Sequence, residues 1–324
     1  MPKLSFPLAA LSLFLVVATA AAQEYPAKTV VLLVPFAAGG PTDTVARSLA
    51  QGMGKALKQT LVVENAVGAG GTIAPAKLKS APADGYTIML AHIGMSTAPA
   101  LYRQLPFKPL EDFEFIGQVV DVPMTLIGKK ELPANDLREL LAYIRANKEK
   151  ISFANAGVGS ASHLCGLLFM SSIQTELTTI PYKGTAPAIN DLLGGQVDIL
   201  CDQTTNTTQY IKAGRVKAYG TTSSARLDSL RELPTLSEAG IPGFEVVVWH
   251  GVYAPKGTPK AVVDKLIVAL QSAIQDSAFV QRMSDLGSQV VTPEKATPAG
   301  LRDRLKTEID KWTPIIRKAG VYAD

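Results

Sequence analysis

Two short segments of very small residues, 36–43 and 155–162, carry the chemistry of this sequence. Each follows an apolar run that predicts a buried strand, and each precedes a run with helical spacing. Small residues leave backbone N–H groups accessible, and the first N–H groups of a helix lack a carbonyl partner within it. Either loop alone is better explained as a tight strand-to-helix turn. Two such loops together favour an anion site, of the kind that suits a carboxylate.

Motifs of the common enzyme classes are incomplete. Segment 157–162 lacks the third glycine of a dinucleotide fingerprint, and segment 68–73 lacks the lysine of a phosphate loop. Ser160 and Ser162 next to His163 admit a hydrolase, but hydroxyls this close to a helix start are more often caps or ligand donors. With three histidines and two cysteines in all, the usual zinc spacings do not occur. We expect no catalysis, no metal and no cofactor.

The N-terminus has the pattern of a cleavable secretory signal. Residues 6–22 are apolar or small and carry no charge, and Ala20-Ala21-Ala22 matches the cleavage signal, so residues 1–22 are predicted to be removed by a cut after Ala22. A membrane anchor is the alternative, but the stretch is short for a spanning helix. We therefore expect an exported protein in a bacterial periplasm.

Composition limits the remaining possibilities. The 324 residues, of which 47% are hydrophobic, suffice for two buried cores. A net charge of +4 without a basic run argues against a nucleic-acid partner. Export favours a disulfide between Cys165 and Cys201, since disulfides persist in oxidising compartments, and two buried free thiols are the alternative.

Strands and helices alternate along the chain and predict an α/β protein with two open, mostly parallel sheets. The first series has strands at 29–35, 60–64 and 86–91 and helices at 44–57, 72–79 and 95–101, with Thr42 or Asp43 as the first N-cap. The second has strands at 115–120, 124–127, 151–154, 179–182, 198–201 and 218–221 and helices at 135–147, 163–173, 187–194 and 209–213. A β-rich run at 245–253 and helices at 260–275 and 301–319 complete the chain.

From about Tyr25 to Tyr322 the sequence resembles the Bug-type (TctC-like) substrate-binding proteins of tripartite tricarboxylate transporters. The resemblance rests on ten segments in the right order, each weak alone. They are Tyr25-Pro26 and 35–43, 65–72, 83–87, 112–113, 157–163, 181–184, 193–198, 233–240 and 254–259.

The resemblance implies a two-lobed periplasmic binding protein, type II-like, with two hinge crossings near 115–120 and 245–252. One lobe would comprise 23–120 and 247–324 and the other 121–246. It also implies a small carboxylate ligand held mainly by backbone groups and waters. By position the ligand site maps onto Phe36, Ala37, Gly39, Gly40, Thr42 and Asp43, onto Gly159, Ser160, Ala161, Ser162 and His163, and onto Ser96 and Asp202.

Trp249 and His250 lie near the second crossing and could reach the ligand, or belong to the core and to backbone hydrogen bonds. Asp43 is more often an N-cap than a ligand contact, and His163 is either a buried imidazole or a contact. Asp202 would repel an anion, so it either orients donors and water or pairs with an amino group. Segment 201–206 is polar where many relatives are apolar, which favours a ligand with a second polar group.

The sequence thus predicts a monomeric solute receptor that closes over a carboxylate and delivers it to a membrane permease. The ligand is a citrate-like acid, a small aliphatic dicarboxylate, or an aromatic dicarboxylate if Trp249 lines the site. A ligand sensor that docks on a membrane signalling protein needs the same cleft, and a secreted hydrolase is the third hypothesis.

Overall fold

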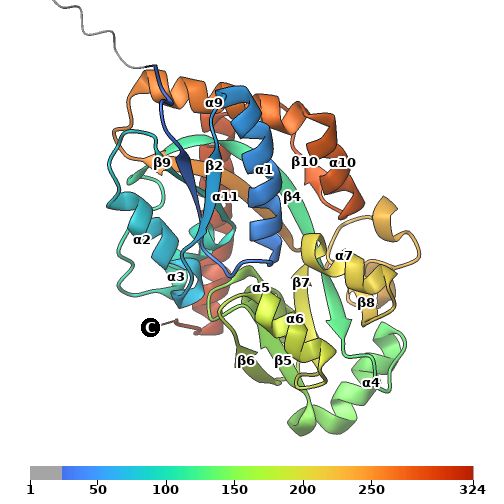
Figure 1. Ribbon diagram of the computed structural model, residues 1–324. Helices are drawn as coiled ribbons and strands as arrows, with labels where there is room; N and C mark the ends of the chain where they lie inside the picture. Colours follow the sequence, from blue (N-terminus) through green and yellow to red (C-terminus); the bar gives the residue numbers. More distant parts are fainter. Residues whose placement is uncertain (1–23, 324) are drawn as a thin grey trace, which may run out of the picture.

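The strand β4 (Phe113–Gly128) runs through the whole sheet and joins its two halves (Figure 1). The structure is a computed structural model that describes residues 24–323, so the predicted signal peptide and its cleavage site lie outside the described residues. Its strand order is β2-β1-β3-β9-β4-β7-β5-β6, with β8 and β10 also paired to β4.

One half of the sheet contains parallel strands β1 (Val30–Val34), β2 (Leu61–Asn65) and β3 (Thr87–His92), followed by β9 (Val247–Pro255), which is antiparallel to β3 and β4. The two-residue strand β10 (Gln289–Val290) pairs with β4. We call the part built on these strands the first lobe.

The other half contains the parallel strands β5 (Ser152–Asn155), β6 (Thr178–Pro181) and β7 (Ile199–Gln203). Here β7 and β8 (Lys217–Thr221) pair antiparallel with the end of β4. We call the part built on these strands the second lobe. The lobe boundaries near residues 120 and 246 stay predictions.

The two strands predicted at 115–120 and 124–127 are one strand, and that prediction was wrong. Pro123 lies between the two predicted segments, and proline cannot donate to a ladder. It stands where β4 stops pairing with Val247 of β9 and starts pairing with β7 at Met124, so no N–H is needed there. Two register shifts before it let β4 bend from one lobe into the other.

The helices flank the sheet, with α1 packed on α9 and α11 packed on α3 and β4. The first lobe carries α1 (Pro41–Leu57), α2 (Ile73–Lys79), α3 (Gly94–Leu101), α9 (Lys260–Gln275), α10 (Ser277–Asp285) and α11 (Pro298–Ala319). The second carries α4 (Leu137–Asn147), α5 (Ala161–Ser172), α6 (Thr185–Leu193), α7 (Thr204–Lys212) and α8 (Leu236–Ala239). Short 3₁₀ turns occupy Ala69–Gly71, Lys148–Lys150 and Asp228–Leu230.

The N-cap of α1 is Gly40, which corrects the prediction of Thr42 or Asp43. Pro41 takes the first helical position, where its missing N–H costs nothing and its fixed φ suits the helix. The short elements α8, α10 and β10 escaped the sequence prediction. The predicted helix 260–275 matches α9, and α10 follows after Asp276 alone, whose carboxylate accepts from the backbone N–H groups of Ala278 and Phe279.

The main hydrophobic core extends through both lobes, with Phe113, Trp249 and Tyr253 among its fully buried side chains. A smaller cluster in the second lobe includes Ile127 and Leu200. Across residues 24–323, no helix combines the length and the apolar character needed to cross a bilayer.

Candidate functional site

Four helices begin at one small cavity between the lobes: α1 from the first lobe, and α5, α6 and α7 from the second. Its volume is about 20 Å³, far below the range typical of ligand pockets. Each helix start contributes unpaired N–H groups and about half a positive charge. The lining residues are Phe36, Pro41, Thr42, His92, Ala156, Ser160, Ala161, Ser162, Thr185, Asp202 and Gln203.

The first-lobe loop is held from behind by Asp43. Its carboxylate accepts from Gly39 N (2.9 Å), Arg47 Nε (2.7 Å) and Asn65 Nδ2 (2.9 Å). Burial alone would raise its pKa, but these donors hold the pKa of Asp43 below its usual value. Both oxygens are occupied and the residue is outside the cavity lining, so Asp43 positions the loop rather than facing the cavity.

The second-lobe loop is fixed by the cap of α5. Ser160 Oγ accepts from the backbone N–H of His163 (3.1 Å), and His163 Nδ1 accepts from Gly159 N (3.3 Å). Ser160 is thus the N-cap and has no hydrogen bond to the imidazole among the described contacts. This is the arrangement of a helix cap rather than of a nucleophile held by its base.

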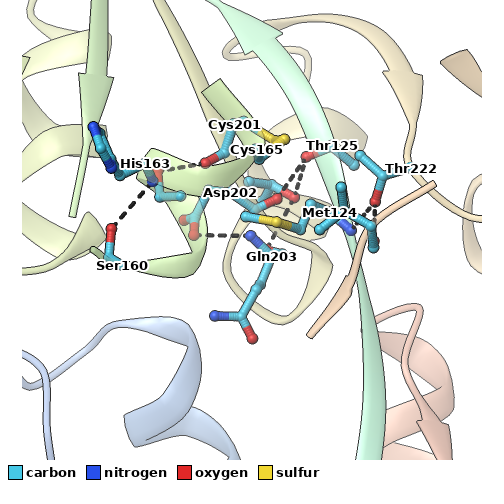
Figure 2. The surroundings of a disulfide bond; sticks show 12 residues. Met124, Thr125, Ser160, His163, Cys165, Cys201, Asp202, Gln203 and Thr222 are labelled. Carbon is cyan, nitrogen blue, oxygen red and sulfur yellow. Dashed lines mark hydrogen bonds between the residues drawn. A yellow bond between two sulfur atoms is a disulfide. The ribbon is translucent and has the colours of Figure 1, made fainter. Parts of the chain in front are cut away.

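A disulfide lies directly behind this loop (Figure 2). Cys165 on α5 is bonded to Cys201 on β7, with the Cα atoms 6.1 Å apart, as predicted. Ser162 Oγ also donates to the carbonyl of Cys201 (2.6 Å). The start of α5 is therefore tied to the strand end that carries Asp202.

Asp202 and Gln203 bring unusual polarity to the cavity. Asp202 is fully buried, and its oxygens accept from Gln203 N (2.8 Å) and Asn206 Nδ2 (2.6 Å). Burial raises the pKa of Asp202 to about 7 despite these neutral donors. Figure 2 shows the Gln203 side chain directed away from the disulfide toward the α1 segment, and its Oε1 has no hydrogen-bond partner. Thr185 Oγ1 is likewise buried without a hydrogen bond of good geometry, although it lies close enough to lower the pKa of Asp202.

Two buried histidines underlie the first-lobe side. His92 stacks on Phe36 and accepts from Gly94 N at Nδ1 (3.0 Å), which leaves its hydrogen on Nε2. His250 meets the carbonyl of Val248 through Nδ1 (3.2 Å), so its unprotonated Nε2 accepts from the hydroxyl of Thr42 (3.4 Å). Burial lowers the pKa of His92 to about 4 and that of His250 still more clearly, so both rings are neutral at pH 7.

The structure brings together six of the predicted site residues, namely Phe36, Thr42, Ser160, Ala161, Ser162 and Asp202. Other predicted residues do not line this cavity: Ala37, Gly39, Gly40 and Asp43 in the first loop, and Gly159 and His163 in the second. Ser96 is buried and donates to Ile93 O (2.6 Å), and His250 lies behind Thr42. Trp249 is fully buried in the main core and outside the lining.

Sequence reasoning missed five lining residues, namely Pro41, His92, Ala156, Thr185 and Gln203. His92 and Gln203 are the last residues of β3 and β7. The predicted strands end at residues 91 and 201, so a search of the two residues after each predicted strand would have found both, because ligands bind at the carboxyl ends of strands in α/β sheets.

The lobes touch at the rim of the cavity through glycines. A Cβ on Gly70 would overlap the carbonyl oxygen of Val158, and one on Gly184 would lie 3.0 Å from Ala37 N. Tyr102 Oη, which donates to Ala69 O (2.7 Å), also reaches Val158 O (3.3 Å). The described arrangement is therefore a closed one.

A larger, open groove lies elsewhere between the lobes, lined by the loop 223–229 and by residues of α10, β10 and α11. Side chains of both charge signs line it, including Asp121, Arg304 and Glu308. None of the four helix starts is among its lining residues. Within residues 24–323, no three His, Cys, Asp or Glu side chains come together in a way that could hold a metal.

A small cavity between two α/β lobes, walled by helix N-termini, defines a two-lobed periplasmic binding protein. Comparison with known proteins identifies the family. Residues 45–321 match the tripartite tricarboxylate transporter family receptor (TctC), and the chain belongs to this family.

Solved structures agree with this assignment. The periplasmic binding protein BugD is 53% identical with a TM-score of 0.90, over 92% of this chain and 99% of that one. MatC from Rhodopseudomonas palustris, with bound malate, is 38% identical with a TM-score of 0.87, over 90% and 100%. A further R. palustris protein, with adipate, is 30% identical with a TM-score of 0.87, over 92% and 99%. The family and these neighbours are substrate-binding proteins.

Proposed function

We propose that this chain is a periplasmic receptor that captures a small aliphatic dicarboxylate in the cavity described above and delivers it to a membrane permease. The observation that carries the proposal is the convergence of four helix N-termini on one small cavity between the lobes. No Lys or Arg lines it, so backbone N–H groups and helix dipoles would supply the positive potential for the ligand carboxylates.

The relatives support the ligand class, since MatC contains malate and the second R. palustris protein contains adipate. The position of Trp249 in the core removes the reason for preferring an aromatic acid. The capping role of Ser160 supports a receptor without catalytic activity. Export with a cut after Ala22, a monomeric state and lobe limits near 120 and 246 are part of the proposal.

The first test is thermal melting of residues 23–324 against mono-, di-, tri- and aromatic carboxylates. A ligand present at about 100 times its Kd adds about 2.7 kcal/mol of stability, which is a shift of a few degrees for a chain of this size. We expect shifts confined to aliphatic dicarboxylates. A folded, ligand-free protein that responds to none of the acids would overturn the proposal.

A matched pair of variants locates the site. Thr185→Val removes a buried hydroxyl that lines the cavity, whereas Thr205→Val removes a buried hydroxyl outside the lining, and neither hydroxyl has a hydrogen bond of good geometry to lose. We expect Thr185→Val to weaken dicarboxylate binding about tenfold, as loss of one hydrogen bond to a charged group does, while Thr205→Val binds normally. Equal affinities in calorimetry would place the ligand elsewhere.

A further inference from the structure

Asp202 conflicts with a dianionic ligand. Its carboxyl group lines the cavity, is fully buried and has only neutral donors, namely Gln203 N–H and the Asn206 amide. Two carboxylates that share a low-dielectric site repel each other, and one of them takes a proton.

The groups around Asp202 cannot supply the missing positive charge. From the first lobe, His92 on β3 lines the cavity and His250 on β9 lies behind Thr42, and both are buried. His163 on α5 is also buried, and burial lowers the pKa of all three rings, so they are neutral at pH 7 to 9. On α1, the positive charge of Arg47 is paired with Asp43, because the guanidinium group donates to both oxygens of that carboxylate. On β4 the facing residue is Thr125, and α6 contributes Thr185.

We propose that Asp202 is a specificity-determining residue of this cavity and takes up one proton from solvent when a dicarboxylate binds, so that the receptor captures a dianion together with a proton. The inference rests on the proposed function. The protonated carboxyl group then donates a hydrogen bond to a ligand oxygen instead of repelling it. The free carboxyl group is already close to this state, because burial raises its pKa to about 7.

The test is calorimetric binding of malate between pH 6 and pH 9, in two buffers of different ionisation enthalpy. Above pH 7 the free protein must first take up the proton, so the affinity should fall by about 50-fold from pH 7 to pH 9 and change by less than about twofold between pH 7 and pH 6. At pH 8.5 the difference between the binding enthalpies measured in the two buffers should correspond to an uptake of about one proton per ligand bound.

Asp202→Asn mimics the protonated state, because the amide keeps one acceptor for Gln203 N–H and Asn206 can turn its own amide to match. We expect this variant to bind malate equally from pH 6 to pH 9, without proton uptake. Asp121→Asn is the matched control, since burial also raises the pKa of Asp121 but its side chain faces the other groove. It should keep the wild-type profile.

Proton uptake by the wild-type protein tests the proposal even if a variant fails to fold. Binding of malate that is flat to pH 9 without proton uptake overturns the proposal, as does a pH slope that survives in Asp202→Asn. Aspartate differs from malate by an ammonium group in place of a hydroxyl. If aspartate binds more tightly than malate and its affinity rises with pH, Asp202 acts ionised as an ammonium partner, which also overturns the proposal. If neither acid binds to any variant at any pH, the proposed function itself fails.

Discussion

At the scale of single residues, buried polar groups rather than charged ones shape this site. His92 shows the principle: its ring is 4% exposed, stacks on Phe36 and accepts the N–H of Gly94. A buried imidazole without an acidic partner is neutral, so it acts as a fixed hydrogen-bonding group of one tautomer. The site thus obtains directional donors without an uncompensated positive charge.

His92 should make the protein acid-sensitive. Its pKa is lowered to about 4 in the folded state, below the 6.5 of an exposed imidazole, so its stabilising contribution is present above pH 6.5 and is lost as the pH falls toward 4. His250 adds to the effect in the same direction. We expect the free energy of unfolding to fall by a few kcal/mol across this range in urea titrations.

The variant His92→Phe keeps the aromatic stack and removes the titrating group. Its stability at pH 7 should be lower, because Gly94 N–H loses its acceptor, but its decline between pH 6.5 and pH 4 should be shallower than in the wild type. An identical decline in both proteins would mean that His92 titrates normally.

At the scale of elements, the second-lobe part of the site depends on how α5 is attached to β7. The disulfide between Cys165 and Cys201 and the hydrogen bond from Ser162 to Cys201 O act at the same junction. They fix the start of α5 relative to Asp202, so the parts of the cavity wall that α5 and β7 contribute should keep a constant position relative to each other.

Removing the disulfide should therefore affect both stability and binding. For a 36-residue separation, the chain-entropy model gives a loss of about 3–4 kcal/mol for the double variant Cys165→Ser/Cys201→Ser. Denaturation in urea measures it, and the reduced wild type should match the variant. A dicarboxylate affinity that is unchanged in the folded variant would contradict the positioning role.

The glycines at the rim set how closely the lobes approach. Gly70→Ala places a methyl group against Val158 O and should disfavour the closed form, lowering dicarboxylate affinity at least tenfold. Gly195→Ala is the control, because its φ is also positive but a Cβ there meets nothing within 4 Å. Both variants carry similar backbone strain, so a larger affinity loss for Gly70→Ala in calorimetry isolates the contact. Equal losses would mean that the rim contact does not limit closure.

At the scale of the whole molecule, the sequence predicted the α/β class, the two strand series and the two loops of small residues that precede α1 and α5. It could do so because β-branched runs and helical spacing are local signals. It could not predict that β4 is continuous, because the change of partner at Pro123 depends on strands far away in the chain. For the same reason it missed Thr185, which reaches the cavity only through tertiary packing.

The continuity of β4 has a consequence for folding. The strand belongs to the sheet of both lobes, and one hydrophobic core extends from Leu32 in the first lobe to Phe153 in the second. Neither lobe can unfold without exposing part of the core and sheet edge of the other. We therefore expect one cooperative transition in calorimetry, with equal calorimetric and van't Hoff enthalpies.

Bound dicarboxylate should shift this single transition as a whole, since the proposed binding cavity is lined by helix starts from both lobes. The Cys165→Ser/Cys201→Ser variant serves as a control, because weakening one lobe alone should lower the whole transition without splitting it. Two resolved transitions, of which the ligand moves only one, would show that the lobes are independent units and that β4 acts as a linker rather than as a shared strand.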